Sequence, residues 1–225
     1  MSTYAATWSG GKDSCFAHWK AIKNGLNVSY LLNFINKDSL KSASHGLDYR
    51  LIALQAQAMK LPIIQQKVTQ GNYEAGFKAA LHDLKEKGFT GLITGDIYLQ
   101  EHRDWIERVC REAGMEAVLP LWQMNTSQLL TNFVAANFKS VIVSVKNDFS
   151  GNNWLGKELD TELASELKQL AETQNIDPAG EHGEYHTFVY DGPTFKKSIK
   201  IIKSTVTSKD NHCFLDILDY DLYNK

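Results

Sequence analysis

Short apolar runs alternate with stretches of helical periodicity through the first half of the chain. The apolar runs lie at residues 4–8, 28–34, 63–68, 91–95 and 116–119. Between them, apolar residues recur every three or four positions, as in Leu47, Leu51, Leu54 and Ala58, which is the period of an amphipathic helix. Strands that alternate with helices favour a parallel sheet with right-handed crossovers and helices on both faces. The predicted fold class is therefore α/β.

The pattern changes after residue 122. Two amphipathic helices are predicted, one around Leu129 and Phe133 and one with Leu159, Leu163, Leu167 and Leu170 on one face, with an apolar strand at 140–145 between them. Three further strands are predicted at 186–190, 198–207 and 213–220, with Lys209-Asp210-Asn211 as a hairpin turn. We therefore divide the chain into a first domain at 1–122 and a smaller α+β domain with antiparallel strands at 123–225.

Composition and charge narrow the class of protein. Of the 225 residues 43% are hydrophobic, which supports a sizeable core, and 24 Lys and Arg nearly balance 26 Asp and Glu. Since no basic block is present, we do not expect nucleic-acid binding. No apolar run approaches ~18 residues, so neither a membrane span nor a signal peptide is predicted. The three cysteines lie far apart and suit a reducing cytoplasm.

A glycine turn joins the first predicted strand to a helix predicted at 15–24, which Gly25 should end. Its sequence is Ser9-Gly10-Gly11-Lys12-Asp13-Ser14. Backbone N–H groups at a helix N-terminus attract an anion, and the glycines let an anion approach the backbone closely. The lysine adds a positive charge and the serines add hydroxyl donors. The turn is therefore predicted to hold a phosphate, and Lys12, at the surface end of the sheet, is expected to be solvated.

Two common phosphate-binding loops do not fit this turn. A Walker A loop requires glycine and Ser/Thr at positions that Ala6 and Asp13 occupy here. The dinucleotide pattern G-x-G-x-x-G is absent as well. The turn instead resembles the PP-loop of the N-type ATP pyrophosphatases, which cleave ATP between the α and β phosphates to adenylate a substrate. The alternative is an ordinary Gly-Gly turn that Ser or Asp caps.

A second polar stretch, residues 179–187, precedes the predicted strand at 186–190. It holds the carboxylates Glu181 and Glu184 and the imidazoles His182 and His186. A zinc site is disfavoured because the H-E-x-x-H pattern on a helix is missing. A solvated turn and a substrate-side loop that closes over the nucleotide remain open. In the second interpretation Glu184 and His186 share one face of an extended segment, with His186 as general base.

The motifs together resemble the diphthine–ammonia ligase family. They are Ser9–Ser14, Ser44-His45-Gly46-Leu47, Gly95-Asp96-Ile97 with Arg103, Glu107 and Cys110, Pro120-Leu121-Trp122, Gly180–Thr187, and Asp191-Gly192-Pro193 with Phe195-Lys196-Lys197. The resemblance covers essentially the whole chain. It implies a PP-loop domain with a Rossmann-like (HUP, adenine nucleotide α-hydrolase-like) fold and a smaller C-terminal domain. It also implies that ATP adenylates a carboxylate and that ammonia displaces AMP to leave an amide.

The motifs and the resemblance assign residues to roles. ATP binding is expected of Ser9, Gly10, Gly11, Lys12, Asp13, Ser14, His45, Gly95 and Asp96. Catalysis is expected of Lys12, Arg103, Glu184 and His186, and substrate binding of Arg103, Glu107, Glu181, Gly183, Glu184 and Tyr185. Asp13 is expected either to ligate Mg²⁺ or only to cap the helix. Arg103 either holds the acceptor carboxylate, stabilises charge on the phosphorane or pairs only with Glu107. Trp8 and Trp122 are expected in the core rather than stacked on adenine.

Two departures from the family pattern concern the acceptor. His186 stands where many members have Glu, and Glu101-His102-Arg103-Asp104-Trp105 keeps one arginine of two. The acceptor is thus either protein-bound diphthine or another carboxylate. The alternatives are a PP-loop enzyme that acts on tRNA or a small carboxylate, and a nucleotide-binding regulatory module. A homodimer through the β-rich part is also expected.

Overall fold

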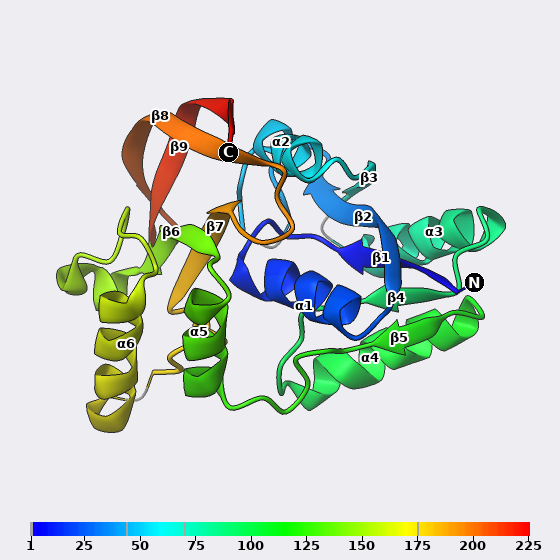
Figure 1. The fold of residues 1–225 in the computed structure, drawn as a ribbon, viewed down its shortest axis with the longest axis horizontal. Coiled ribbons are helices and arrows are strands. Elements are labelled where there is room, and N and C mark those ends of the chain that lie inside the picture. Colours follow the sequence, from blue (N-terminus) through cyan, green and yellow to red (C-terminus); the bar gives the residue numbers. More distant parts are fainter. Residues whose placement is uncertain (1, 44, 70, 175) are drawn as a thin grey trace. The chain divides into compact units, whose positions relative to one another are not determined.

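The computed structural model describes residues 2–43, 45–69, 71–174 and 176–225. The chain splits into two compact units, Met1–Gln123 and Met124–Lys225 (Figure 1). Within the described residues, no helix is both long enough and apolar enough to cross a bilayer.

The first unit is a parallel α/β sheet. Its elements are β1 (Thr3–Thr7), α1 (Lys12–Lys23), β2 (Asn27–Asn36), α2 (Tyr49–Met59), β3 (Ile63–Val68), α3 (Tyr73–Glu86), β4 (Gly91–Ile93), α4 (Gln100–Glu112) and β5 (Glu116–Val118). The five strands run in the order β3-β2-β1-β4-β5, and each described pair is parallel. The predicted fold class is confirmed. One boundary differs, because α1 begins at Lys12 rather than Cys15, which places the end of the glycine turn inside its first turn.

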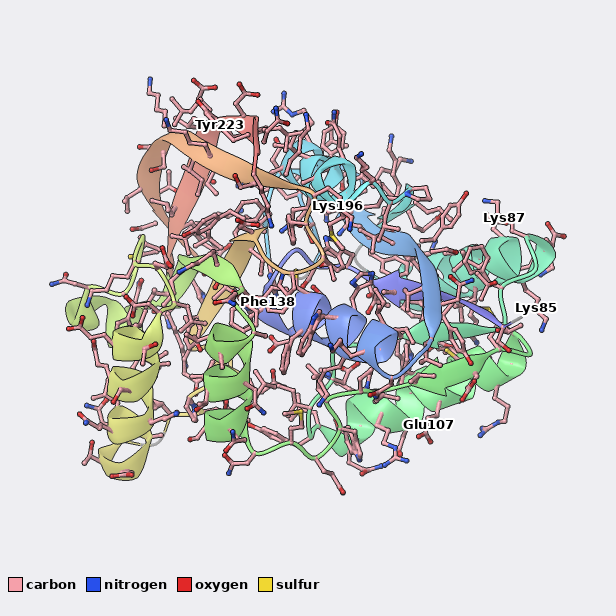
Figure 2. All side chains as sticks on the ribbon, in the orientation of Figure 1. Lys85, Lys87, Glu107, Phe138, Lys196 and Tyr223 are labelled. Atoms are coloured by element: carbon pink, nitrogen blue, oxygen red, sulfur yellow. The ribbon has the colours of Figure 1, made fainter. Side chains whose placement is uncertain are left out.

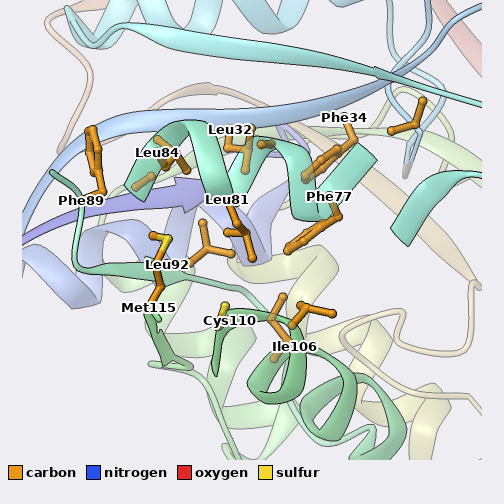
Figure 3. Close-up of a cluster of buried hydrophobic side chains, with 14 residues drawn as sticks. Leu32, Phe34, Phe77, Leu81, Leu84, Phe89, Leu92, Ile106, Cys110 and Met115 are labelled. Atoms are coloured by element: carbon orange, nitrogen blue, oxygen red, sulfur yellow. The ribbon is translucent and has the colours of Figure 1, made fainter. Parts of the chain in front are cut away.

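The core of this unit lies on both faces of the sheet. Ala5, Leu32 and Leu92 are buried in one cluster with apolar side chains of α3 and α4, such as Leu81 and Ile106 (Figure 3). Successive residues of a strand point to opposite faces of the sheet. The buried residues next to these three in sequence therefore pack on the other face, where α1 and α2 contact the strands. Burial on both faces explains why the strands are continuous apolar runs rather than alternating ones.

The second unit is an α+β sheet. Its elements are α5 (Thr126–Ala135), β6 (Lys139–Lys146), the 3₁₀ helix η1 (Asn147–Asn152), α6 (Thr161–Thr173), β7 (Tyr185–Asp191), β8 (Lys197–Lys209) and β9 (His212–Asn224). The strand order is β7-β6-β9-β8 and the described pairs are antiparallel, as predicted. The hairpin turn is also confirmed, since Asp210 and Asn211 have φ of 48° and 63°, as a two-residue type I′ turn requires. Leu159, however, precedes α6, because Asp160 caps that helix with a 2.9 Å hydrogen bond from Leu163 N–H.

Candidate active site

The loops after β1 and β4 meet at the carboxyl edge of the first sheet. From β1 the chain adds β2 and β3 on one side of the sheet and then β4 and β5 on the other, so β1 and β4 flank the topological switch point. Ligands of such sheets bind in the crevice at this point. The contact is close: a Cβ added at Gly95 would lie 2.9 Å from the carbonyl carbon of Asp13 and 3.0 Å from the nitrogen of Ser14. The structure therefore brings the Ser9–Ser14 turn and the Gly95-Asp96 segment together, and only glycine fits at position 95.

The glycine turn forms a compact cap on the first turn of α1. Gly11 is the N-cap residue, and its backbone N–H donates a 3.3 Å hydrogen bond to the Ser9 hydroxyl. The Ser14 hydroxyl lies 3.1 Å from that of Ser9 and donates to the Gly11 carbonyl at 3.1 Å. Gly10 has φ of +84°, a conformation that favours glycine. The backbone N–H groups of the first helical turn and the helix dipole can together hold an anion at this position.

A buried glutamine that the sequence analysis did not single out forms a hydrogen bond with the backbone of the glycine turn. Gln55 of α2 is 0% exposed; its Oε1 accepts a 2.9 Å hydrogen bond from Trp8 Nε1, and its Nε2 donates to the Gly10 carbonyl at 2.9 Å. A Cβ at Gly10 would lie 2.4 Å from Ile52 Cδ1. The only available signal was a polar residue on the apolar face of a predicted helix. Gln55 thus fixes where the Gly10-Gly11 backbone lies.

A second buried amide joins the turn to the loop before α2. Asn33 of β2 donates from Nδ2 to the Trp8 carbonyl at 2.8 Å and to the Ser42 hydroxyl at 3.2 Å. This loop carries His45, whose predicted contact with a nucleotide stays a prediction. Ser44, part of the same sequence motif, lies outside the described residues.

Lys12 is not solvated as expected. Its side chain is 4% exposed, and its Nζ lies 2.9 Å from Asp13 Oδ2. The early start of α1 is the reason, since Lys12 belongs to the first helical turn rather than to a loop at the surface. The lysine charge is consequently held beside the Asp13 carboxylate in the first turn of α1.

The segment after β4 places Arg103 of α4 beside Trp122. Arg103 donates from Nε to Glu107 Oε1 at 2.6 Å, the pairing expected at this spacing, and Glu107 lies on α4 (Figure 2). The Arg103 guanidinium carbon lies 4.9 Å from the centroid of the Trp122 ring. Trp122 is only partly buried, so the prediction that it is a core residue is wrong. His102 Nδ1 lies 3.4 Å from Asp96 Oδ1.

In the second unit, Glu184 lies in the turn before β7 rather than on an extended segment with His186. Its carboxylate is 2% exposed and accepts hydrogen bonds from the backbone N–H groups of Asp177 at 2.6 Å and His182 at 3.0 Å. Tyr185 is buried, and its hydroxyl donates to the Pro178 carbonyl at 2.7 Å. Both side chains therefore shape the loop. No group of three His, Cys, Asp or Glu residues suited to a metal occurs among the described residues.

Glu184→Gln is expected to lower the free energy of unfolding by about 1–2 kcal/mol, because the new amide group would face a backbone N–H and leave that donor unsatisfied. Urea denaturation of the variant measures this effect. Glu172→Gln, at an exposed position of α6, is the matched control and should change the unfolding free energy by less than ~0.5 kcal/mol. A Glu184→Gln protein with full stability but without turnover would instead assign this carboxylate to the chemistry.

Comparison with known proteins identifies relatives of both units. Residues 2–117 match the family model of the diphthamide synthase N-terminal domain, and residues 125–222 match that of the C-terminal domain. The diphthine–ammonia ligase of Mus musculus is 29% identical over 95% of this chain and 88% of its own length. That of Rattus norvegicus is 30% identical over 88% of this chain and 82% of its own. A solved structure, a predicted subunit of tRNA methyltransferase from Methanocaldococcus jannaschii, covers 86% of this chain with 15% identity and a TM-score of 0.46.

Proposed function

Because the chain belongs to the diphthamide synthase family, we propose that it is an ATP-dependent ligase that adenylates a carboxylate and converts it into an amide with ammonia. One observation carries the proposal. The glycine turn and the first turn of α1 present a lysine, two hydroxyls and helix N-terminal N–H groups where the strand order reverses. This set suits the leaving pyrophosphate of ATP.

In the first step, an oxygen of the acceptor carboxylate attacks the α-phosphorus of ATP. The bond from this phosphorus to the bridging oxygen breaks, and pyrophosphate leaves with the electron pair. Developing charge on pyrophosphate is stabilised by prearranged donors, which here are the backbone of Gly10 and Gly11, the hydroxyls of Ser9 and Ser14, and Lys12. We assign His45, Gly95 and Asp96 to the nucleotide as well.

In the second step, the nitrogen of ammonia attacks the acyl carbon, the bond to the AMP oxygen breaks, and the nitrogen loses a proton. His186 is our proposed acceptor of that proton, since imidazole titrates near neutral pH. The acceptor-side role predicted for Glu181, Gly183 and Tyr185 stays a prediction. For Glu184 we propose a positioning role, because backbone N–H groups already occupy its carboxylate.

Magnesium fits this scheme through Asp13. Mg²⁺ is usually held by one or two carboxylates together with phosphate oxygens and water, and no larger cluster of ligands is found in the described parts of the chain. Asp13, at the start of α1 beside Lys12, would supply the protein ligand. When bound, the ion would neutralise phosphate charge.

Protein-bound diphthine is our proposed acceptor, following the names of the relatives. Of the two departures from the family pattern, Trp105 has a structural explanation. Its ring centroid lies 4.8 Å from that of Phe77, and its Nε1 donates to Glu74 at 2.8 Å, so it anchors α4 to α3. Trp105 therefore supplies no argument for a different acceptor, and His186 is the departure that still bears on specificity.

ATP turnover is expected to yield AMP and pyrophosphate, and to depend on a diphthine-bearing protein and ammonium. Chromatography of the nucleotides after incubation with Mg-ATP measures the products. Parallel incubations with tRNA, with small carboxylates and without acceptor test the alternatives. ADP as the product contradicts a PP-loop reaction, and tRNA-dependent AMP release assigns a different acceptor.

The remaining proposals concern assembly and location. A homodimer through the β-rich part is supported by the exposed apolar side chains of Ile202, Val206 and Leu218 on β8 and β9. The cytoplasm is our proposed compartment, because Cys15, Cys110 and Cys213 are free thiols.

A further inference from the structure

The guanidinium of Arg103 is fixed by two contacts that leave its outer end open. Nε donates to Glu107 at 2.6 Å, and the guanidinium carbon lies 4.9 Å from the centroid of the Trp122 ring. Arginine carries five N–H donors in a planar fork, and only the one on Nε is used here. Within the described residues, the two terminal nitrogens have no hydrogen-bond partner. The ring contact and the ion pair thus hold the guanidinium in place, with its terminal donors available.

Trp122 adds a second donor beside this fork. Its indole Nε1 is buried from solvent and has no hydrogen-bond partner in the described part of the chain. An indole nitrogen can only donate, and a buried donor left unpaired costs about 1–3 kcal/mol. The terminal nitrogens of the partly exposed Arg103 and the buried indole N–H of Trp122 are all donors, and a set of neighbouring donors is the complement of an anion. A ligand whose oxygen atoms accept hydrogen bonds would therefore satisfy both side chains.

We propose that Arg103 and Trp122 form a carboxylate clamp that binds the acceptor's carboxylate before adenylation. This assignment rests on the proposed function. A carboxylate is planar and accepts two parallel hydrogen bonds from the terminal nitrogens of arginine, a geometry that lysine cannot reproduce. The indole N–H would donate to one of the same oxygens.

The charge and position of the clamp favour a carboxylate over a polyphosphate. Glu107 already balances the charge of Arg103, so the site selects by hydrogen-bond geometry more than by excess positive charge. Trp122 follows β5, which lies beyond β4 in the strand order and so roughly 10 Å from β1 at the usual strand spacing. Gln123 N–H donates to the Ile97 carbonyl at 2.7 Å and ties this segment to the loop after β4. The clamp is thus beside, and separate from, the donors that face pyrophosphate.

Two conservative variants test the clamp, and their control residues lie on α4, the helix that carries Arg103. Trp122→Phe keeps an aromatic ring under the guanidinium but removes the N–H, and Arg103→Lys keeps the charge but removes the fork. The controls are Trp105→Phe and Arg108→Lys, whose donors are taken by Glu74 at 2.8 Å in each case. The probes are a protein that carries diphthine and the same protein that carries the amide product, with binding measured by calorimetry and AMP release by chromatography.

We expect the wild-type chain to bind the carboxylate probe more tightly than the amide probe. Trp122→Phe should raise the Kd and the KM for the carboxylate probe about 10-fold, and Arg103→Lys about 50-fold, the scale of losing hydrogen bonds to a charged group. The KM for ATP should stay within about twofold, and so should every value for the two controls. Trp122→Phe should not lower the unfolding free energy, because it removes an unpaired donor.

Each contrary result has a distinct meaning. An increased KM for ATP with unchanged acceptor binding overturns the clamp and assigns these donors to the nucleotide. Unchanged values for both substrates, or equal affinity of the wild-type chain for carboxylate and amide probes, overturn it as well. A wild-type chain that binds the carboxylate probe through Arg103 but releases no AMP supports the clamp and overturns the proposed function.

Discussion

Replacing Lys12 with methionine is expected to reduce AMP release about 1000-fold. Removal of one prearranged charged donor from a reaction that develops phosphate charge costs roughly 10²–10³ in rate, and Lys12 is the only lysine in the glycine turn. Because the side chain is 4% exposed and ion-paired with Asp13, its loss also affects folding. We expect about 1–2 kcal/mol of lost stability, the scale of leaving a partly buried group without its partner.

The measurement separates these two effects. Denaturation gives the folded fraction of Lys12→Met, and AMP release is then compared per folded molecule. Methionine keeps much of the lysine volume, which limits the loss of packing. Lys23→Ala, an exposed lysine of the same helix, is the matched control and should leave turnover within about twofold. Turnover near the wild-type rate in folded Lys12→Met would show that the turn is structural.

Lowering the pH is expected to cost the fold about 3 kcal/mol through His18 alone. This side chain of α1 is 1% exposed, and its ring lies edge-on to Trp8 with centroids 5.6 Å apart. Neither ring nitrogen has a hydrogen-bond partner within the described residues. Desolvation by burial lowers the pKa of His18 from 6.5 to about 4. A pKa difference of one unit corresponds to ~1.4 kcal/mol, which gives the expected total.

The direction in which stability changes with pH follows from the number of protons that each state binds. The unfolded chain takes up the proton near pH 6.5 and the folded chain only near pH 4, so the unfolded state binds more protons between these values. The contribution of His18 is therefore complete above pH 6.5 and is lost as the pH falls to about 4. Since Trp8 also binds Gln55, which holds Gly10, we expect the glycine turn to be disturbed over the same range.

Urea denaturation from pH 7 to pH 4 provides the measurement, with His18→Phe as the comparison. Phenylalanine keeps an aromatic ring beside Trp8 and cannot titrate. Carboxylates titrate in both proteins, so the difference between the two stability curves isolates His18. Parallel curves would contradict the lowered pKa. A wild-type curve that falls more steeply by ~3 kcal/mol would agree with it.

Local patterns determined much of the architecture. Apolar residues that recur about every 3.6 positions located the helices, and continuous apolar runs located the strands. These patterns can be read from the sequence because the burial of each element favours apolar residues within that element itself. Gly25 ends α1 with φ of +83°, as predicted from its position after the periodic residues. The Ser9–Ser14 motif could likewise be read from the sequence, since its donors are neighbours along the chain.

Contacts between distant segments decided the rest. Trp8 and Gln55 bond across 47 positions, and nothing near either residue indicates the other. The burial of Lys12 depends on where α1 begins, and Glu184 is committed to backbone groups that the fold of its loop brings within 3.0 Å. The stack of Arg103 on Trp122 needs the end of β5 beside the start of α4. Sequence periodicity reports which face of an element is buried, whereas hydrogen-bond partners of buried polar groups are set only when the elements pack.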